Sequence, residues 1–393
     1  MNCNVCSRTA IDPIFASAGP TALTSLCELR AGRVEVWSCT ECGHLFAPAL
    51  QNTEEYYSTD YRILLSHDDE DQIYETGPSG IVYRTEHQLQ TLLARIAIPN
   101  GTKVLDYGCA KASTPARLLG VRPDVQLHLF DVSDMYLEYW KRILPADRYA
   151  INETPDGWVA RFDLITSFFA LEHIPRPPET IAHIHRLLRD GGRFYCVIPD
   201  TFGNVADFVV IDHVNHFTEE SLRHLLTAAG FVDIDVDSTV HRGAHVVTAI
   251  KRASGIPPPL TPDRPTRAEV ANANARAAGV AEFWRNLDAQ IQAAELAAAG
   301  LKSAIYGSGF YGAYIMSLLL NKEDVICFLD RSPFQQGKTL HGRPIFSPDS
   351  LPESVKLVYV GLNPVIAKAA IAELPALTGR DLTFIYLEGS PRP

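Results

Sequence analysis

The sequence predicts a three-part α/β protein, in which a small cysteine-rich lobe precedes two domains built on mainly parallel sheets. Three observations support this fold class. Two Cys-x-x-Cys pairs stand near the N-terminus, strand-like and helix-like segments alternate over residues 85–250, and a second series of this kind begins at Ser303. A chain of 393 residues is also too long for one ordinary core, so several domains are expected.

Composition and charge exclude several kinds of partner. Hydrophobic residues make up 46% of the chain and charged residues 21%, as in ordinary globular domains. The net charge is -11 and no basic run is present, so we expect no nucleic-acid partner. No signal-peptide pattern or membrane-spanning apolar run is visible, which favours a cytoplasmic protein without membrane contact. The oligomeric state stays open.

Four of the eight cysteines form two close pairs, Cys3 with Cys6 and Cys39 with Cys42. Each pair has the spacing of a zinc knuckle, and four thiolates complete a closed tetrahedral site that stabilises folding and cannot activate water. The long spacer, residues 7–38, predicts a β-rich insertion between the knuckles. A redox pair is the alternative, but one redox motif would not explain two pairs.

Tyrosines cluster directly after this lobe. Tyr56, Tyr57 and Tyr61 stand close together before an acidic stretch. Their polar neighbours suit the lining of a cleft, and packing in a core is an equally open alternative.

The middle of the chain has the pattern of an α/β domain. A helix is expected over residues 84–98, and a terminal strand pair closes the series. The expected strands cover residues 102–108, 127–133, 162–168, 191–199, 230–240 and 244–252.

A proline-rich stretch, residues 251–266, predicts a linker. In the alanine-rich helix that follows, apolar residues recur on one face, so we expect this helix to pack across the domain junction. These residues are Val280, Trp284, Leu287 and Ile291.

The strand over residues 102–108 ends in a tight turn of small residues that opens a helix. Such a turn lets a ligand approach the backbone closely. Asp131 ends the next strand, about 20 residues further on, where a carboxylate can accept both hydroxyls of a ribose. Ala110 and Ala112 stand where a dinucleotide-binding turn would have glycine.

These segments, VLDYGCA with Asp131, FDLITSFFALEHI and RDGGRFYCVIPD, resemble class I S-adenosylmethionine-dependent methyltransferases. The resemblance implies S-adenosylmethionine as cofactor, with contacts to its methionine, ribose and adenine and to the pocket wall. In that order the implied residues are Asp106 and Gly108, Asp131, Asn152 and Glu153, and Ser167 and Phe168.

The order of parts is similar to that of three-domain sugar C-methyltransferases, which act on nucleotide-linked 4-keto deoxysugars. We therefore expect a zinc-binding domain over residues 1–65, a methyltransferase domain over 66–252, and a linker, helix and Rossmann-like domain over 253–393. The family stretch Tyr-x-Glu-His-x-x-Tyr-Phe corresponds here to Val210, Asp212, His213, His216 and Phe217. The acid–histidine pair is kept, and both tyrosines are replaced.

Methylation of carbon requires a base that removes a proton beside a carbonyl and a donor that stabilises the enolate oxygen. Histidine titrates near neutral pH, so we assign His213 as the base and Asp212 as its partner or a second proton shuttle. Adjacent side chains of a strand point in opposite directions, so this partnership requires a turn in the backbone. His173 follows the carboxyl end of a strand and is the second candidate donor.

Because both family tyrosines are missing, another residue must donate the hydrogen bond to the enolate oxygen. The alternative is that the methyl group is not transferred to carbon. The candidates are His173, His216, Tyr56, Tyr57 and Tyr61. A metal held by Asp212, His213 and His216 is disfavoured, because the segment lacks the helical His-Glu-x-x-His arrangement. A hydrated turn before a helix capped by Thr218 is a further alternative for this segment.

The C-terminal series opens with a full G-x-G-x-x-G, formed by Gly307, Gly309 and Gly312, and Asp330 ends the next strand. The motif by itself predicts a dinucleotide site. The sugar C-methyltransferase resemblance implies instead that this domain encloses the nucleotide sugar. Tyr61 and His241 are the further substrate contacts that we expect.

Three other functions stay open at this point. The first is O- or N-methylation of an activated sugar or small metabolite. The second is an NAD-dependent oxidoreductase that uses the C-terminal domain, and the third is a non-catalytic S-adenosylmethionine sensor.

Overall fold

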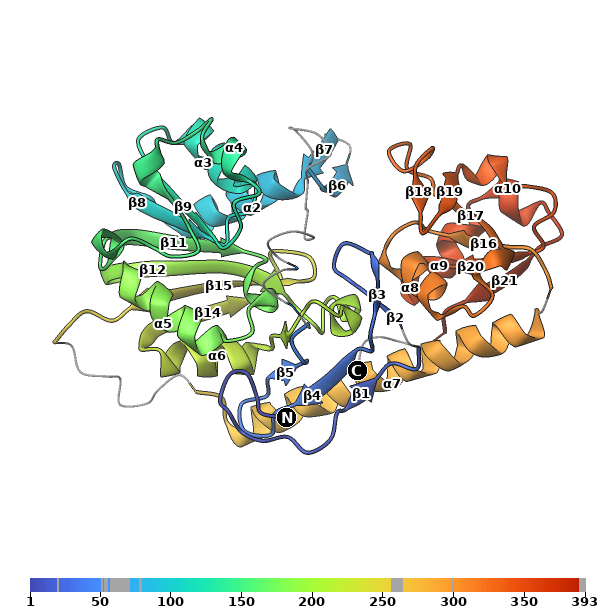
Figure 1. Ribbon diagram of the computed structural model, residues 1–393, viewed down its shortest axis with the longest axis horizontal. Helices are drawn as coiled ribbons and strands as arrows, with labels where there is room; N and C mark the ends of the chain where they lie inside the picture. The colour runs from blue at the N-terminus through green and yellow to red at the C-terminus, as the bar shows by residue number, and fades with distance from the viewer. Residues whose placement is uncertain are drawn as a thin grey trace.

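We describe the protein from a computed structural model, which covers residues 1–19, 21–50, 52, 56, 71–77, 80–255, 264–298 and 300–388. The middle and C-terminal domains lie at opposite ends of the molecule, with the N-terminal lobe between them (Figure 1). The long helix α7 (Arg267–Ala297) runs beneath all three parts.

The middle domain is a sheet of seven described strands in the order β10-β9-β8-β11-β12-β15-β14. The first five pair in parallel, and β15 lies antiparallel between β12 and β14. This confirms the predicted parallel core with a terminal strand pair. The strands are β8 (Lys103–Tyr107), β9 (Gln126–Asp131), β10 (Tyr149–Ile151), β11 (Phe162–Phe168), β12 (Leu188–Pro199), β14 (Phe231–Asp237) and β15 (Ala244–Lys251).

Helices cover both faces of this sheet because its strands are apolar on both sides. Successive residues of a strand point to opposite faces, so Val104 and Leu105 enter different hydrophobic clusters. One face is covered by α2 (Arg84–Arg95), α3 (Ser113–Val121) and α4 (Leu137–Trp140), and the other by α5 (Pro177–Leu187) and α6 (Glu219–Ala228). Ahead of α2 stands a hairpin, β6 (Ile73–Gly77) with β7 (Gly80–Tyr83).

The N-terminal lobe contains the β-rich insertion that the long cysteine spacer predicted. Its sheet has the order β1-β4-β5-β13, and a separate hairpin pairs β2 with β3. The strands are β1 (Phe15–Ala16), β2 (Thr21–Leu23), β3 (Leu29–Ala31), β4 (Glu35–Ser38), β5 (Leu45–Phe46) and β13 (Asn215–His216). The last of them comes from the middle domain, so the predicted catalytic segment completes the sheet of the lobe.

Helix α7 joins the three parts through one apolar face, as its sequence predicted. Thr266 and Glu269 form a capping box at its start. The predicted face residues Val280, Trp284, Leu287 and Ile291 are all 0% exposed. They share one cluster with residues of the lobe, the middle domain and the C-terminal domain, including Phe15, Phe208 and Phe328.

The C-terminal domain is a second parallel sheet, in the order β18-β19-β17-β16-β20-β21, with β18 antiparallel at its edge. Its strands are β16 (Ser303–Tyr306), β17 (Val325–Leu329), β18 (Thr339–Leu340), β19 (Arg343–Phe346), β20 (Leu357–Val360) and β21 (Thr383–Tyr386). The helices are α8 (Phe310–Leu318), α9 (Pro364–Ala372) and α10 (Pro375–Thr378).

The described ranges contain no helix with the length and apolar character needed to cross a membrane. The predicted domain limits after residues 65 and 252 fall in or beside 57–70 and 256–263, which lie outside the described residues. These limits stay predictions.

Two glycines of the C-terminal motif are required by packing. A Cβ on Gly312 would lie 1.9 Å from the Gly307 carbonyl oxygen, and one on Gly307 would lie 2.5 Å from the Gly361 oxygen. A Cβ on Gly309 meets no atom within 4 Å. The spacing of Gly307 and Gly312 is therefore explained by the contact of the turn with α8 and with the end of β20.

We predict that Gly312→Ala lowers the free energy of unfolding by about 3 kcal/mol or more, because the added methyl group overlaps backbone atoms. Gly309→Ala is the matched control and changes stability by less than about 1 kcal/mol. Thermal and urea unfolding of both variants measure this difference. Equal stability of the two variants would contradict the packing role.

Candidate functional site

One large cavity, of about 1130 Å3, lies at the carboxyl ends of the central strands. The last residues of β8, β9 and β11 line it, namely Tyr107, Asp131 and Phe168. The lobe contributes Ser25 to Cys27, and the C-terminal domain contributes Phe310 from the first turn of α8. All three parts of the chain therefore meet around one cavity.

The turn after β8 forms the floor of one end of the cavity. Gly108 has a φ of 75°, and a Cβ there would lie 2.7 Å from the Ala170 side chain, so glycine is required. Ala110 and Ala112, which replace expected glycines, adopt the same left-handed region with φ of 43° and 60°. The substitutions therefore leave the predicted turn in place.

Asp131 is held by backbone groups of this turn. The Ala110 amide donates to Oδ2 at 2.8 Å, and the Ser133 amide donates to Oδ1 at 3.1 Å. Nearby, burial raises the pKa of Asp106 to about 7, although a hydrogen bond from Thr166 opposes this shift.

Most of the predicted cofactor residues gather at this end. The cavity is lined by Asp106, Gly108, Asp131, Asn152 and Phe168. Ser167 and Glu153 do not line it, because Ser167 is 0% exposed within β11 and Glu153 points to solvent. The tight turn after β8, beside a half-buried carboxylate, fits S-adenosylmethionine, and Asp131 is the residue that would hold the ribose.

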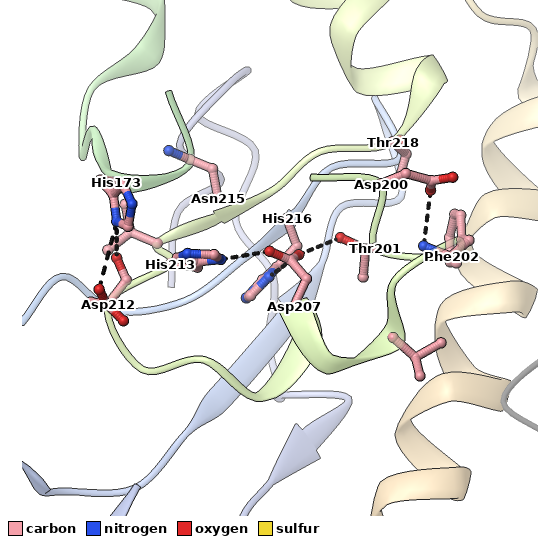
Figure 2. Close-up of polar contacts among 12 residues, drawn as sticks. His173, Asp200, Thr201, Phe202, Asp207, Asp212, His213, Asn215, His216 and Thr218 are labelled. Carbon is pink, nitrogen blue, oxygen red and sulfur yellow. Dashed lines mark hydrogen bonds and ion pairs between the residues drawn. The ribbon is translucent and has the colours of Figure 1, made fainter. Parts of the chain in front are cut away.

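At the other end, a fully buried carboxylate lies between two histidines. His213 Nδ1 donates to Asp207 Oδ1 at 2.5 Å, and His216 Nδ1 donates to Oδ2 at 2.9 Å. The Thr201 hydroxyl adds a bond to Oδ2 at 2.7 Å. Figure 2 shows the contacts of Asp207 with His213, His216 and Thr201, with His213 and Thr201 on opposite sides of the carboxylate.

These charges shift one another strongly. Burial by itself would raise the pKa of Asp207, but the charges of His216 and His213 hold it well below its usual range. Burial disfavours the His213 imidazolium, yet Asp207 outweighs this effect and raises the pKa of His213 to about 9. His213 is therefore protonated at neutral pH.

The prediction that Asp212 is the partner of His213 is corrected by this arrangement. Asp212 Oδ1 accepts from the Ser25 amide at 2.7 Å, and Oδ2 accepts from the Ser25 hydroxyl at 2.8 Å and from Tyr56 at 3.3 Å. Residues 211 and 212 lie in a turn, yet the Asp212 carboxylate is held by Ser25 of the lobe while Asp207 pairs with His213. A role for Asp212 as a second proton shuttle stays a prediction.

Of the three predicted catalytic histidines, two line the cavity and one does not. His173 and His213 both line it, with ring centroids 4.7 Å apart and an angle of 79° between the planes. His173 Nδ1 lies 3.1 Å from the Asp212 carbonyl oxygen. His216 is 0% exposed behind Asp207, so it acts on the site only through that carboxylate.

Several predicted substrate contacts lie elsewhere. Tyr57 and Tyr61 are outside the described residues, whereas Tyr56 is buried and donates to Asp212. His241 is 3% exposed and packs behind Phe169, which lines the cavity.

The C-terminal motif lies next to the cavity through α8. Asp330 accepts from the Ser308 amide at 3.0 Å and from the Ser332 amide at 2.8 Å, in the same pattern as Asp131. Gly307 and Gly312 pack closely against backbone atoms, whereas Gly309 has free space around its Cα. Its neighbour Phe310 is the residue of this domain that reaches the cavity.

The four predicted zinc ligands form one cluster in the lobe. Cys3 Sγ lies 3.7 Å from Cys42 Sγ, and Cys6 Sγ lies 3.4 Å from Cys39 Sγ. Sulfurs at about 2.3 Å from a tetrahedral zinc are about 3.8 Å apart, so the cluster fits this ion.

The first cysteine pair also contacts the chain segment that carries His213. Asn4, inside the first knuckle, donates to the Val214 carbonyl at 3.0 Å and to Asn215 at 3.1 Å. Asn215 in turn donates to the carbonyls of Leu171 and Ile174. The N-terminal lobe therefore positions both chain segments that carry His173 and His213.

The middle of the chain is similar to known methyltransferases. Residues 81–236 match the family model described as "Methyltransferase domain". Among solved structures, similarity is found to three methyltransferases, each over 42% of this chain.

Haemonchus contortus phosphoethanolamine N-methyltransferase 2, in complex with phosphomonomethylethanolamine and S-adenosylhomocysteine, is 16% identical, with a TM-score of 0.34 and 52% of its chain covered. The CurJ carbon methyltransferase is 15% identical, also with a TM-score of 0.34 and 52% coverage. An S-adenosylmethionine-dependent methyltransferase from Mesorhizobium loti is 16% identical, with a TM-score of 0.35 and 97% coverage. The match spans about half the length of the first two proteins.

The family match and the strand order define the middle of the chain as a class I methyltransferase domain, as the sequence predicted. The chain therefore contains an S-adenosylmethionine-dependent methyltransferase domain.

Sequence reasoning missed Asp207 and Glu172. Asp207 stands in the apolar run VADFVV, and an isolated acid in such a run is the signal that could have found it. Glu172 directly precedes His173 and lines the cavity at 2% exposure. Nothing in the local sequence distinguishes it from a surface acid.

We predict that Asp207→Asn lowers the free energy of unfolding by about 3 kcal/mol at pH 6, because it leaves histidines buried without their carboxylate. The folded pKa of His213, about 9, is above its unfolded value of 6.5. The ion pair of His213 with Asp207 therefore stabilises the folded state fully below pH 6.5, and this contribution is lost as the pH rises through 9.

The difference in stability between Asp207→Asn and wild type should accordingly shrink as the pH rises from 6 to 10. Urea unfolding across this range measures it. Thr201→Val is the control, since it removes a neutral donor and keeps the charge. A difference that does not depend on pH would contradict the ion pair.

Proposed function

We propose that this enzyme methylates a carbon atom of a nucleotide-linked keto deoxysugar by way of an enolate. The observation that carries the proposal is the continuity of one cavity from Gly108 and Asp131 to His173 and His213. Acid–base side chains therefore stand beside the end of the cavity that fits the methyl donor. When bound, S-adenosylmethionine supplies an electrophilic methyl group.

The charge state of His213 supports carbon chemistry. An enolate requires a donor for its oxygen, and a buried imidazolium held by Asp207 meets this need. This differs from the base role expected for His213 from the sequence, because a protonated ring cannot accept a proton. We propose His213 as the oxygen donor, in place of the missing tyrosine.

The size and lining of the cavity support a large, anionic substrate. Arg84 and Arg176 are among the residues that line it, and guanidinium groups suit the phosphates of an activated sugar. Phe310 supports a contribution of the C-terminal domain to the same substrate. The similarity in order of parts to three-domain sugar C-methyltransferases supports the sugar as the substrate class.

We also propose that Cys3, Cys6, Cys39 and Cys42 hold one structural zinc ion. The sulfur separations support it, and so do amide donors to the sulfurs, from Val5 to Cys3 and from Glu41 to Cys39, each at 3.4 Å. Such bonds stabilise thiolates in the charged form that a metal requires.

For the reaction, we predict that the enzyme adds one methyl group to a nucleotide-linked keto sugar and exchanges its α-proton in heavy water. His213→Ala should lower both rates about a hundredfold or more, because the enolate loses its donor. A mass-spectrometric screen of such sugars measures methyl gain and deuterium gain together. His185→Ala is the control, since His185 lies on α5 outside the cavity.

Two results would overturn this proposal. Methyl transfer to oxygen or nitrogen without α-proton exchange would place the reaction on another atom. Calorimetric binding of NAD with no binding of S-adenosylhomocysteine would favour an oxidoreductase.

For the metal, we predict about one zinc per purified chain and its loss in Cys39→Ser. Since the knuckle residue Asn4 holds the catalytic segment, activity and thermal stability should fall together. Elemental analysis and thermal unfolding measure both effects. Cys27→Ser, a cysteine outside the cluster, should keep its zinc, and a metal-free wild type would refute the site.

A further inference from the structure

Glu172 is a buried acid at the centre of the site, and one of its carboxylate oxygens has no hydrogen-bond partner among the described residues. It lies in a single 3-10 turn, Leu171–His173, at 2% exposure, and it lines the cavity. Its Oε2 is buried and finds no hydrogen-bond partner among the described residues. Burying an ionisable group without a partner is costly, so a purely structural role does not explain it.

The position of Glu172 is rigid. The Val214 amide donates to its carbonyl oxygen at 2.9 Å. Asn215 donates to the carbonyls on either side, Leu171 at 3.0 Å and Ile174 at 2.7 Å. The turn that carries Glu172 is thereby fixed against the segment that carries His213.

The carboxylate, His173 and His213 converge on one point. Each offers a donor atom, and these atoms lie within 4.8 Å of one another. His213 Nδ1 is engaged by Asp207, which leaves Nε2 as the nitrogen for a substrate. A keto group can therefore meet a donor at His213 while its α-carbon faces Glu172.

We propose that Glu172 is the catalytic base that removes the α-proton of the keto substrate, with protonated His213 as the donor to the developing enolate oxygen. This inference rests on the proposed function and supplies the base that the charged His213 cannot be.

The charges around Glu172 agree with this role. Burial raises the pKa of Glu172 to about 7, while His213 and Arg84 lower it and Asp207 raises it. Burial lowers the pKa of His173 to about 4, so its ring is neutral and weakly basic at pH 7. A base with a pKa near the working pH is the most effective one.

The step balances in protons and electrons. A Glu172 oxygen takes the α-proton, the C–H pair becomes the enolate double bond, and the carbonyl π pair moves to the oxygen opposite His213. The enolate carbon then bonds to the methyl group, and the sulfonium keeps the pair of the broken S–C bond. Glu172 finally releases its proton to solvent.

The test is the isosteric variant Glu172→Gln in the full-length enzyme, measured for α-proton exchange in heavy water and for methyl transfer. We expect both rates to fall about a hundredfold or more, with unchanged affinity for S-adenosylhomocysteine. Glu172→Asp keeps the carboxylate and should recover part of the exchange rate. Glu219→Gln is the matched control, because Glu219 lies on α6 outside the cavity and pairs with Arg223 at 2.9 Å.

The pH profile gives a readout that a structural role would not move. In the wild type, the exchange rate should rise through about pH 7 as Glu172 ionises and fall above about pH 9 as His213 loses its proton. The limb near pH 7 should be absent from the residual rate of Glu172→Gln.

Two results would overturn the role of Glu172. One is exchange by a folded Glu172→Gln at the wild-type rate. The other is chelator-sensitive activity with a second metal bound beyond the cysteine site, which would make Glu172 a metal ligand. Failure of the proposed function is distinct, because wild type would then exchange no keto-sugar proton.

Discussion

The chain segment from Asp207 to His216 belongs to two parts of the protein at once, and this double attachment organises the site. Its last residues form β13 in the sheet of the N-terminal lobe, where Asn215 pairs with Phe46 and His216 with Leu45. Its first residues belong to the methyltransferase domain. Because each end is tied to a different body, the turn between them has little freedom, and His213 is presented to the cavity in one orientation.

The buried charge of Asp207 is the energetic counterpart of this constraint. A carboxylate at 0% side-chain exposure is tolerated only with donors on both oxygens, and two histidines with Thr201 provide them. The same contacts that stabilise Asp207 favour the imidazolium form of His213 and fix the orientation of its ring. Stability and the proposed chemistry are thus coupled, since loss of the ion pair would also remove the proposed proton donor.

The fold and the cofactor end of the site could be predicted from sequence because their signals are local. The strands over residues 103–168 are apolar runs separated by turn residues, Gly108 directly follows β8, and Asp131 is the last residue of β9. The partner of His213 could not be predicted in this way. Asp212 is adjacent in sequence yet points to Ser25, whereas Asp207 reaches the ring because the backbone turns at Val210.

The amino-acid sequence by itself determined the cysteine pairs, the parallel sheets, the apolar face of α7 and the residue types available for catalysis, since these follow from periodicity and spacing along the chain. Only the tertiary structure decided which of these residues act together. Glu172 and His213 are distant in sequence and meet because Asn4 and Asn215 join the first cysteine pair, β13 and the turn at Leu171–His173. Such contacts depend on how separate elements pack, and packing across sequence-distant elements leaves no local pattern to read.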